Sequence, residues 1–399
     1  MNFVSHYNHQ NQIDLNYAGT SLAIIGIIFA IILFCSLRKK NNSLQASDEF
    51  LCFDTSNTLR GIAILFLIFG HLAIHCIDQE IFFEYAGKWG VIIFLYVSGV
   101  ALCKRYDINN IKYTFIENRI IRLFYPYITT MLLFITLDYL LLRKTYSTTK
   151  IIQTLLFLHM RGAPNAAAWF VTYIIYLYTL FFLTSKMKLN KLNKILILFI
   201  SIYLTSICIQ EIGFLCPRFS IWVQYTSVFP LSVAIGIYYK KIHSILTRLN
   251  KFSRVLFYTM TILLALQYFT GKGNYFVSHL FDVAIYNKWI NSLTPITLII
   301  SLVMFTFIAD SLPWKQNMLI FLGKYSFEIF LIHVPFMVYY DFFLFRTPLY
   351  FYFYIYIAVV VLLSVLLKKT SSILNELTLR KLAIKGQKIA KIGLLLQPR

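Results

Sequence analysis

The segment TLRGIAILFLIFGHLAIH, residues 58–75, decides the fold class of this chain. It is an apolar run of about the length that crosses a bilayer, yet it carries Arg60 near one end and His71 and His75 further along. Ionisable side chains are expensive to place in hydrocarbon, so they mark functional sites in membrane helices. Because an α-helix turns by roughly 100° per residue, Arg60 and His71 lie on one helix face, about 16 Å apart along the axis.

The composition of the whole chain is also that of a membrane protein. Of its 399 residues, 59% are hydrophobic and only 13% are charged, a balance that excludes an ordinary soluble globular domain. The sequence therefore predicts an all-α, polytopic membrane helix bundle with about eleven transmembrane helices. The expected spans are residues 17–37, 59–77, 86–103, 123–142, 169–185, 195–210, 222–239, 255–270, 291–309, 318–340 and 349–367.

The basic residues predict how these spans are oriented. The formal net charge is +21, and in a chain this apolar such an excess is typical of cytoplasmic loops rather than of nucleic-acid binding. If the N-terminus is outside, the inside segments hold 26 Lys and Arg and the outside segments hold 9, counting Lys88 at the outer end of the span 86–103. The positive-inside rule then places the C-terminus in the cytoplasm. The inside segments are 38–58, 104–122, 186–194, 240–254, 310–317 and 368–399.

The two ends of the chain flank a central membrane domain predicted over residues 51–370. Within residues 1–50, the first span has basic residues after it and none before it, the reverse of a signal peptide, so we expect it to remain as an anchor. Residues 371–399 form a basic, intermittently apolar tail. This tail is expected either as an amphipathic helix on the anionic leaflet or as a solvated segment.

His71 is the first candidate for chemistry, because a buried imidazole titrates near neutral pH and can take a proton from a hydroxyl. His75 and Asp78 follow on the same stripe if the helix continues, where Asp78 would orient an imidazole. The alternative is that these side chains only hydrogen-bond a neighbouring helix.

A second group of residues predicts an anion site. Arg119 and Arg122, in ENRIIRLFYPY, are three residues apart and share a helix face. Paired guanidinium groups match the oxygens of phosphate and pyrophosphate, although anchoring at the interface also explains them. Both arginines are expected on the same side of the membrane as Arg60, which favours an anion site over simple anchoring at the interface. The small Ser98, in FLYVSG, allows a ligand or another helix to approach closely.

Three more polar or aromatic residues are weaker candidates. Trp169, at the outer end of its span, is either an interface residue or part of a cavity wall. Glu328 and His333 lie in LGKYSFEIFLIH, about 140° apart around the helix, so they serve different neighbours, as site residues or as structural hydrogen-bonding groups. The six cysteines contain no Cys-x-x-Cys pair and predict neither a metal site nor a disulfide framework.

Taken together, these features resemble the acyltransferase family 3 membrane proteins. The resemblance covers roughly residues 50–370 and rests on Arg60 and His71 with ten residues between them, FLYVSG, the arginine doublet followed by Pro126, WF at 169–170, and LGKYSFEIFLIH. It implies a ten-helix core, here with one added N-terminal helix. It also implies a bacterial inner-membrane enzyme that O-acylates sugars of lipopolysaccharide, capsule or another surface polysaccharide.

The resemblance also implies roles for the candidate residues. His71 matches the catalytic base and Arg60 its partner, while Arg119 and Arg122 match the doublet associated with the acyl donor, usually acetyl-CoA. Ser98 and Trp169 are grouped with the donor site. The supporting candidates are His75, Asp78, Glu328 and His333. The expected partners are thus an acyl-CoA, a glycan acceptor and membrane lipid, with no metal and no nucleic acid.

Two other functions remain open from the residues alone. Intramembrane His, Glu and Arg also form proton relays and anion pathways, so a transporter or flippase for a glycan or an anionic small molecule is the main alternative. A glycan polymerase is the other alternative. Such enzymes depend on a large outer loop, however, and the outer loops of this chain are short.

The charge distribution generates a test of orientation. Lys188 lies in a predicted cytoplasmic segment, so a Lys188→Cys variant lacking the six native cysteines should react with a membrane-impermeant maleimide only after the cells are opened. Reaction in intact cells would reverse the predicted topology. A cysteine at Lys150, in a predicted outer segment, should show the opposite pattern.

Overall fold

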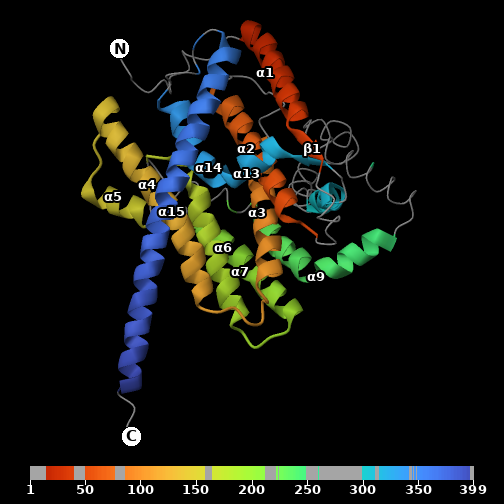
Figure 1. Ribbon diagram of the computed structural model, residues 1–399, viewed down its shortest axis with the longest axis vertical. Coiled ribbons are helices and arrows are strands. Elements are labelled where there is room, and N and C mark those ends of the chain that lie inside the picture. Colours follow the sequence, from red (N-terminus) through yellow and green to blue (C-terminus); the bar gives the residue numbers. More distant parts are fainter. Residues whose placement is uncertain are drawn as a thin grey trace.

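The computed structural model describes residues 15–39, 50–76, 86–157, 164–211, 224–248, 299–310, 314–340 and 348–395, with a few single positions between them. Over this part the chain is a helix bundle, which confirms the predicted all-α membrane fold (Figure 1). The helices are α1 (Leu15–Cys35), α2 (Phe53–Cys76), α3 (Ala86–Arg105), α4 (Thr114–Leu142), α5 (Thr148–Leu155), the short 3₁₀ helix η2 (Ala166–Ala168), α6 (Trp169–Ser185), α7 (Lys191–Glu211), α9 (Val228–Arg248), Ile299–Asp310, α13 (Asn317–Lys324), α14 (Ser326–Val338) and α15 (Leu349–Leu395).

Several described helices are long and apolar enough to cross a membrane. Within the described residues there are five, and the bent pair α13 and α14 would make a sixth. The predicted span 255–270 lies outside the described residues, so the count of eleven stays a prediction. Several helices run past the predicted spans: α4 starts at Thr114 and α9 continues to Arg248, because hydropathy marks only the apolar part of a helix.

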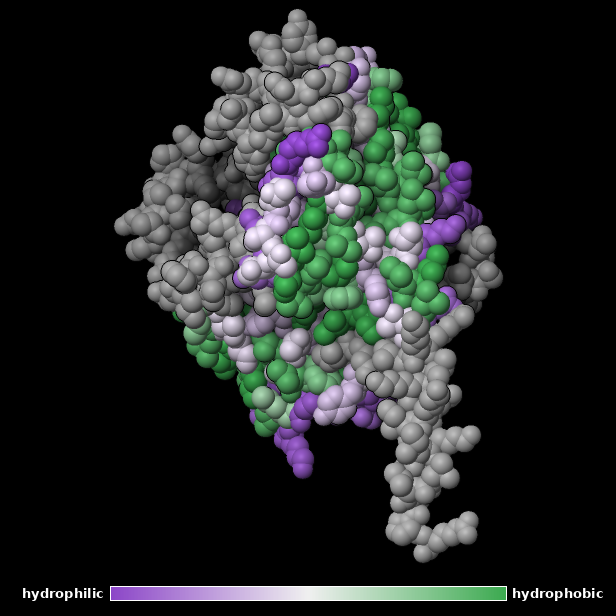
Figure 2. All heavy atoms as spheres, turned by 90° about the vertical axis from the view of Figure 1, so that its left-hand side faces the viewer, coloured by the Kyte–Doolittle hydropathy of each residue, from purple (hydrophilic) through white to green (hydrophobic). Residues whose placement is uncertain are grey.

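The described surface of the bundle is largely apolar. On the face in Figure 2, hydrophobic side chains form the largest areas, and strongly hydrophilic ones form smaller groups at its lower end, along its flanks and in its upper middle. An apolar surface this extended is unfavourable in water, whereas it is favourable in contact with lipid. Large exposed hydrophobic residues on α4, α7 and α15 include Leu132, Leu140, Leu196, Ile200, Leu362 and Leu366.

The basic connecting segments gather at one end of the bundle. Residues in β1 (Leu37–Lys39) pair with β2 (Trp314–Gln316) in an antiparallel ribbon that the sequence did not predict. Lys104 Nζ donates to the carbonyl oxygen of Phe50 at 2.6 Å, and Lys194 Nζ donates to that of Ile108 at 3.2 Å. Segments 38–58, 104–122, 186–194 and 310–317 therefore share one end, as their assignment to one membrane side requires.

The predicted span 318–340 is a broken helix. The axes of α13 and α14 differ in direction by 77°, with the break at Tyr325. The Ser326 hydroxyl donates to the Gly323 carbonyl oxygen at 2.9 Å and satisfies part of the broken backbone. Within a membrane, interrupted backbone needs such partners, because lipid offers none.

Close backbone contact holds α13 against α2. A Cβ atom on Gly61 of α2 would collide with the Leu319 backbone of α13, and one on Gly323 of α13 would collide with the Asn57 backbone of α2. Only glycine allows this approach from both sides, which is how membrane helices pack tightly where hydrocarbon supplies no driving force. This contact fixes where α14 begins relative to α2.

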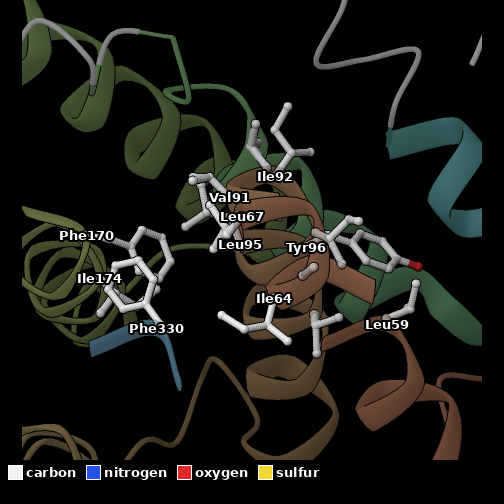
Figure 3. Close-up of a cluster of buried hydrophobic side chains, with 14 of the residues drawn as sticks. Leu59, Ile64, Leu67, Val91, Ile92, Leu95, Tyr96, Phe170, Ile174 and Phe330 are labelled. Atoms are coloured by element: carbon white, nitrogen blue, oxygen red, sulfur yellow. The ribbon is translucent and has the colours of Figure 1, made fainter. Parts of the chain in front are cut away.

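The buried core joins α2 and α3 to α6 and α14. Figure 3 shows Leu59, Ile64 and Leu67 of α2 and Val91, Ile92, Leu95 and Tyr96 of α3, together with Phe170 and Ile174 of α6 and Phe330 of α14. Every one of these side chains is buried. The core therefore fixes the four helices that carry most of the candidate residues.

The ends of the chain pack against or extend from this core. Tyr354 of α15 donates its hydroxyl proton to the Ile25 carbonyl oxygen of α1 at 2.7 Å, which ties the first helix to the last. The basic tail continues α15 without a break to Leu395, so α15 is a single helix of 47 residues. Its expected placement on the leaflet stays a prediction.

The glycine contact predicts that Gly323→Ala lowers the free energy of unfolding by about 1–3 kcal/mol, because the added methyl meets rigid backbone. Gly26→Ala is the matched control, since nothing lies within 4 Å of its Cβ position. Thermal unfolding of both purified variants in detergent measures the difference. Equal stability of the two variants would show that α13 does not approach α2 this closely.

Candidate active site

A cavity of about 240 Å³ lies between α2, α3, α6 and the corner where α13 meets α14. Its polar lining includes Arg60, Ser98, Tyr178, Ser326, Glu328 and Lys368, and its aromatic walls are Phe94, Phe170, Phe327 and Phe330. Lys324 is exposed and the Lys368 side chain is 43% exposed, so the cavity opens on their side. Arg60 stands about 10 Å along α2 from the start of the helix, near the end with the basic segments.

Arg60 and Arg119 approach the same tyrosine. Tyr178 of α6 lies close enough to both guanidinium groups to interact with them, and its hydroxyl is 2.5 Å from the Ser98 hydroxyl. The Arg119 guanidinium lies 6.0 Å from the Tyr178 ring centroid and 5.6 Å from that of Tyr106. Rings on two sides hold this cation in place. The structure thus gathers Arg60, Ser98 and Arg119, whereas Arg122 is exposed on α4.

His71 faces His333. The two ring centroids, one on α2 and one on α14, are 5.3 Å apart, and the ring planes are tilted by 51°. His333 is fully buried, and its Nδ1 lies 2.9 Å from the Phe330 carbonyl oxygen and 3.1 Å from that of Ile329. Because a carbonyl oxygen only accepts, this contact favours a proton on Nδ1, which leaves Nε2 as the basic nitrogen of the neutral ring.

An aromatic layer separates the histidine pair from the cavity. Phe330 is buried, lines the cavity, and has its ring centroid 5.9 Å from that of His333 and 5.5 Å from that of Phe170. His71 is not among the described residues that line the cavity. Arg60 thus lines the cavity and His71 does not, and Phe330 lies against both the cavity and His333.

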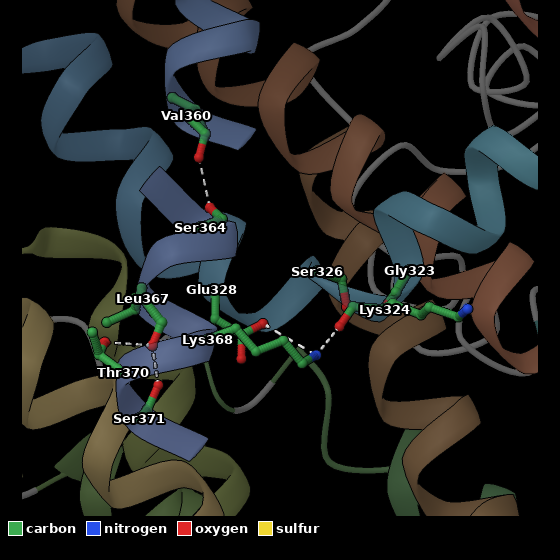
Figure 4. A network of polar contacts seen from close by, with 10 residues as sticks. All are labelled: Gly323, Lys324, Ser326, Glu328, Val360, Ser364, Leu367, Lys368, Thr370 and Ser371. Carbon is green, nitrogen blue, oxygen red and sulfur yellow. Dashed lines mark hydrogen bonds and ion pairs between the residues drawn. The ribbon is translucent and has the colours of Figure 1, made fainter. Parts of the chain in front are cut away.

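Glu328 lies in the cavity and is paired across helices. Its carboxylate is 3.7 Å from Lys368 Nζ of α15, and the same ammonium donates to the Lys324 carbonyl oxygen at the end of α13 (Figure 4). The Glu328 side chain is only 8% exposed. Glu328 and His333 contact different neighbours, as their angular separation on the helix predicted.

Trp169 lies in a neighbouring aromatic cluster. Its ring stacks on Tyr225, with centroids 6.1 Å apart and planes within 18°, and it is 6.3 Å from Tyr173. The next residue, Phe170, lines the cavity instead. The His75 side chain and Asp78 lie outside the described residues. Over the described chain, no group of three or more His, Cys, Asp or Glu side chains is arranged to hold a metal ion.

Sequence reasoning missed two residues of this site. Tyr178 is one of 28 tyrosines and sits in an apolar run, so nothing local distinguishes it. Lys368 directly follows a predicted span, where a basic residue is ordinarily an interface anchor. Only the packing of α6 and α15 around the α13 and α14 corner brings them to the cavity.

Comparison with known protein families identifies the family of this chain. The sequence profile of the family 3 acyltransferase domain matches residues 54–369, from the first turn of α2 to α15. The chain belongs to acyltransferase family 3. It is thus a membrane-embedded acyltransferase, and α1 lies outside the matched region. Searches of curated proteins and of solved structures gave no match.

The aromatic layer in this acyltransferase predicts the effect of removing Phe330. Phe330→Ala should join the cavity to the histidines and speed the modification of His71 and His333 by diethyl pyrocarbonate, a water-soluble imidazole reagent. Phe134→Ala is the control, because Phe134 is equally buried in α4 but does not line the cavity. Both truncations should cost about 3–5 kcal/mol of stability. Equal modification rates in the two variants would contradict the role of Phe330 as a barrier.

Proposed function

We propose that this protein is a bacterial inner-membrane O-acyltransferase. It takes acetyl from cytoplasmic acetyl-CoA and transfers it to a hydroxyl of a surface polysaccharide, a lipopolysaccharide or a lipid-linked glycan. Its N-terminus lies outside and its C-terminus in the cytoplasm. The observation that carries the proposal is a cationic cavity at the basic end of the bundle, one buried aromatic layer away from a pair of facing imidazoles.

The charges of the cavity support a coenzyme A donor. Coenzyme A carries several phosphate groups, and Arg60, Lys324 and Lys368 among the lining residues are cationic, with Arg119 beside Tyr178. Guanidinium groups bind phosphate through charge-assisted hydrogen bonds. The cavity is smaller than the roughly 300–1,000 Å³ of typical ligand sites, so it takes only part of this donor. Arg122, which is exposed on the same helix as Arg119, would bind the part of the donor that lies outside the cavity.

The histidine pair supports base catalysis by His71. In this mechanism His71 removes the proton from the acceptor hydroxyl, and the oxygen attacks the thioester carbonyl carbon. The C–S bond then breaks, the acetyl group becomes an ester, and the proton leaves with the coenzyme A thiolate as a thiol. The buried His333 ring would position His71. A relay, in which the acyl group crosses the bilayer on an intermediate carrier before it meets the glycan, uses the same groups.

Trp169 is proposed to belong to the donor site, and His75 and Asp78 are proposed to support His71. Trp169 stacks within an aromatic cluster next to Phe170, which lines the cavity, and a flat aromatic surface of this kind also stacks on the adenine ring of a nucleotide. His75 and Asp78 follow His71 toward the predicted outer end of α2. No metal has a part in this mechanism.

One observation favours the transporter alternative. The broken span formed by α13 and α14 is a feature of secondary transporters, whose substrates bind where helices are interrupted. A transporter would move a glycan or an anion without forming an ester. A covalent product therefore separates the two functions.

The proposed mechanism predicts that His71→Ala abolishes the transfer of labelled acetyl from acetyl-CoA to glycan, by a factor of at least about 100. Coenzyme A binding should persist, because His71 does not line the cavity. His243→Ala is the control: this histidine of α9 packs on Phe307, away from the cavity. Transfer that survives His71→Ala unchanged would exclude His71 as the base. Transport of labelled glycan without any ester product would favour the alternative.

A further inference from the structure

We propose that Lys368 binds a phosphate group of the acyl donor, and that Glu328 competes with this phosphate for the Lys368 ammonium. The inference rests on the proposed function, because it assumes a donor that carries phosphate. It adds Lys368 of α15 to the donor site and assigns the buried Glu328 a role in the same site.

The position of Lys368 suits a ligand at the cavity mouth. Its side chain reaches from α15 to the corner between α13 and α14, where the ammonium lies 3.7 Å from the Glu328 carboxylate (Figure 4). The Lys368 side chain is 43% exposed, on the side where the cavity opens. The Lys324 side chain extends away from Glu328 in the same view, so Lys368 is the lysine that faces Glu328.

Glu328 differs from the other charged residues of the cavity. It is the single acidic residue among the described lining residues, beside the cations Arg60, Lys324 and Lys368. Its side chain is 8% exposed, so water does little to screen its charge. A negative charge held this close to a site for anions opposes their binding, and it is tolerable because Lys368 neutralises it when the site is empty.

Glu328 and Lys368 differ in how exposed their side chains are. The carboxylate is buried and cannot leave, whereas the half-exposed lysine has a flexible stem that can turn toward a ligand. Phosphate oxygens offer Lys368 a stronger partner than a single carboxylate 3.7 Å away. The pair therefore holds the ammonium in place at the entrance before the donor arrives.

A purely structural salt bridge makes a different prediction. Lys368 also donates to the Lys324 carbonyl oxygen and so stabilises the end of α13. If this were its whole role, loss of either charge would destabilise the bundle and leave phosphate binding unchanged. If Glu328 competes with phosphate, removal of the two charges has opposite effects on affinity.

The test is equilibrium binding of coenzyme A, of adenosine 3′,5′-bisphosphate and of pantetheine, which lacks phosphate, to the full-length protein in detergent. Lys368→Ala should weaken the binding of both phosphate ligands about fivefold to tenfold. Glu328→Gln should strengthen it by a similar factor, and neither variant should alter pantetheine binding. Lys368→Arg should keep most of the affinity because it keeps the charge.

Lys369→Ala is the matched control, because this exposed lysine is the next residue of α15 and does not line the cavity. If Lys368→Ala unfolds, the double variant Lys368→Gln, Glu328→Gln removes both charges together and leaves no unpaired carboxylate. In this double variant, the affinity for the two phosphate ligands should depend less steeply on ionic strength than it does in the unmodified protein.

The outcomes separate this inference from the proposed function. If the unmodified protein binds coenzyme A and Lys368→Ala binds it as tightly as Lys369→Ala does, the inference is wrong and the donor assignment stands. Weaker phosphate binding in Glu328→Gln would also overturn it. If the unmodified protein binds none of the three ligands, both the donor assignment and the inference fail.

Discussion

The contact between α2 and α13 is the constraint on which the site depends. Gly61 and Gly323 let the two backbones meet without side chains between them, so the end of α13 is fixed against the first turns of α2. The chain then turns by 77° at Tyr325 and continues as α14. As a result, one helix presents Glu328 to the cavity beside Arg60 and presents His333 to His71.

This arrangement solves a problem particular to chemistry within a membrane. Charged groups that bind a polar donor need water and counter-charges, whereas a base that takes a proton from a hydroxyl benefits from a site without competing water. In this acyltransferase the cations line a cavity that opens at the basic end of the bundle, and the imidazoles lie beyond Phe330. One packed aromatic residue thus lies against both a cavity lined with cations and a pair of facing imidazoles.

The sequence predicted those features that depend on local pattern. Hydrophobic composition and span lengths gave the membrane bundle, and the helical repeat placed Glu328 and His333 toward different neighbours, as the structure confirms. The order and spacing of Arg60, His71 and LGKYSFEIFLIH also pointed to the family that the profile match identifies. The break at Tyr325 was not predicted, because the run from 318 to 340 has the hydropathy of one continuous span.

The sequence by itself determined the fold class, the family and which helices carry ionisable groups, because these follow from the composition and order of neighbouring residues. Only the tertiary structure decided which of those groups meet. Tyr178 and Lys368 join the cavity while Trp169 packs beside it, although nothing in their neighbouring residues distinguishes them. Such contacts join residues far apart in the chain, and they depend on how closely helices approach and where one of them bends, which no local pattern records.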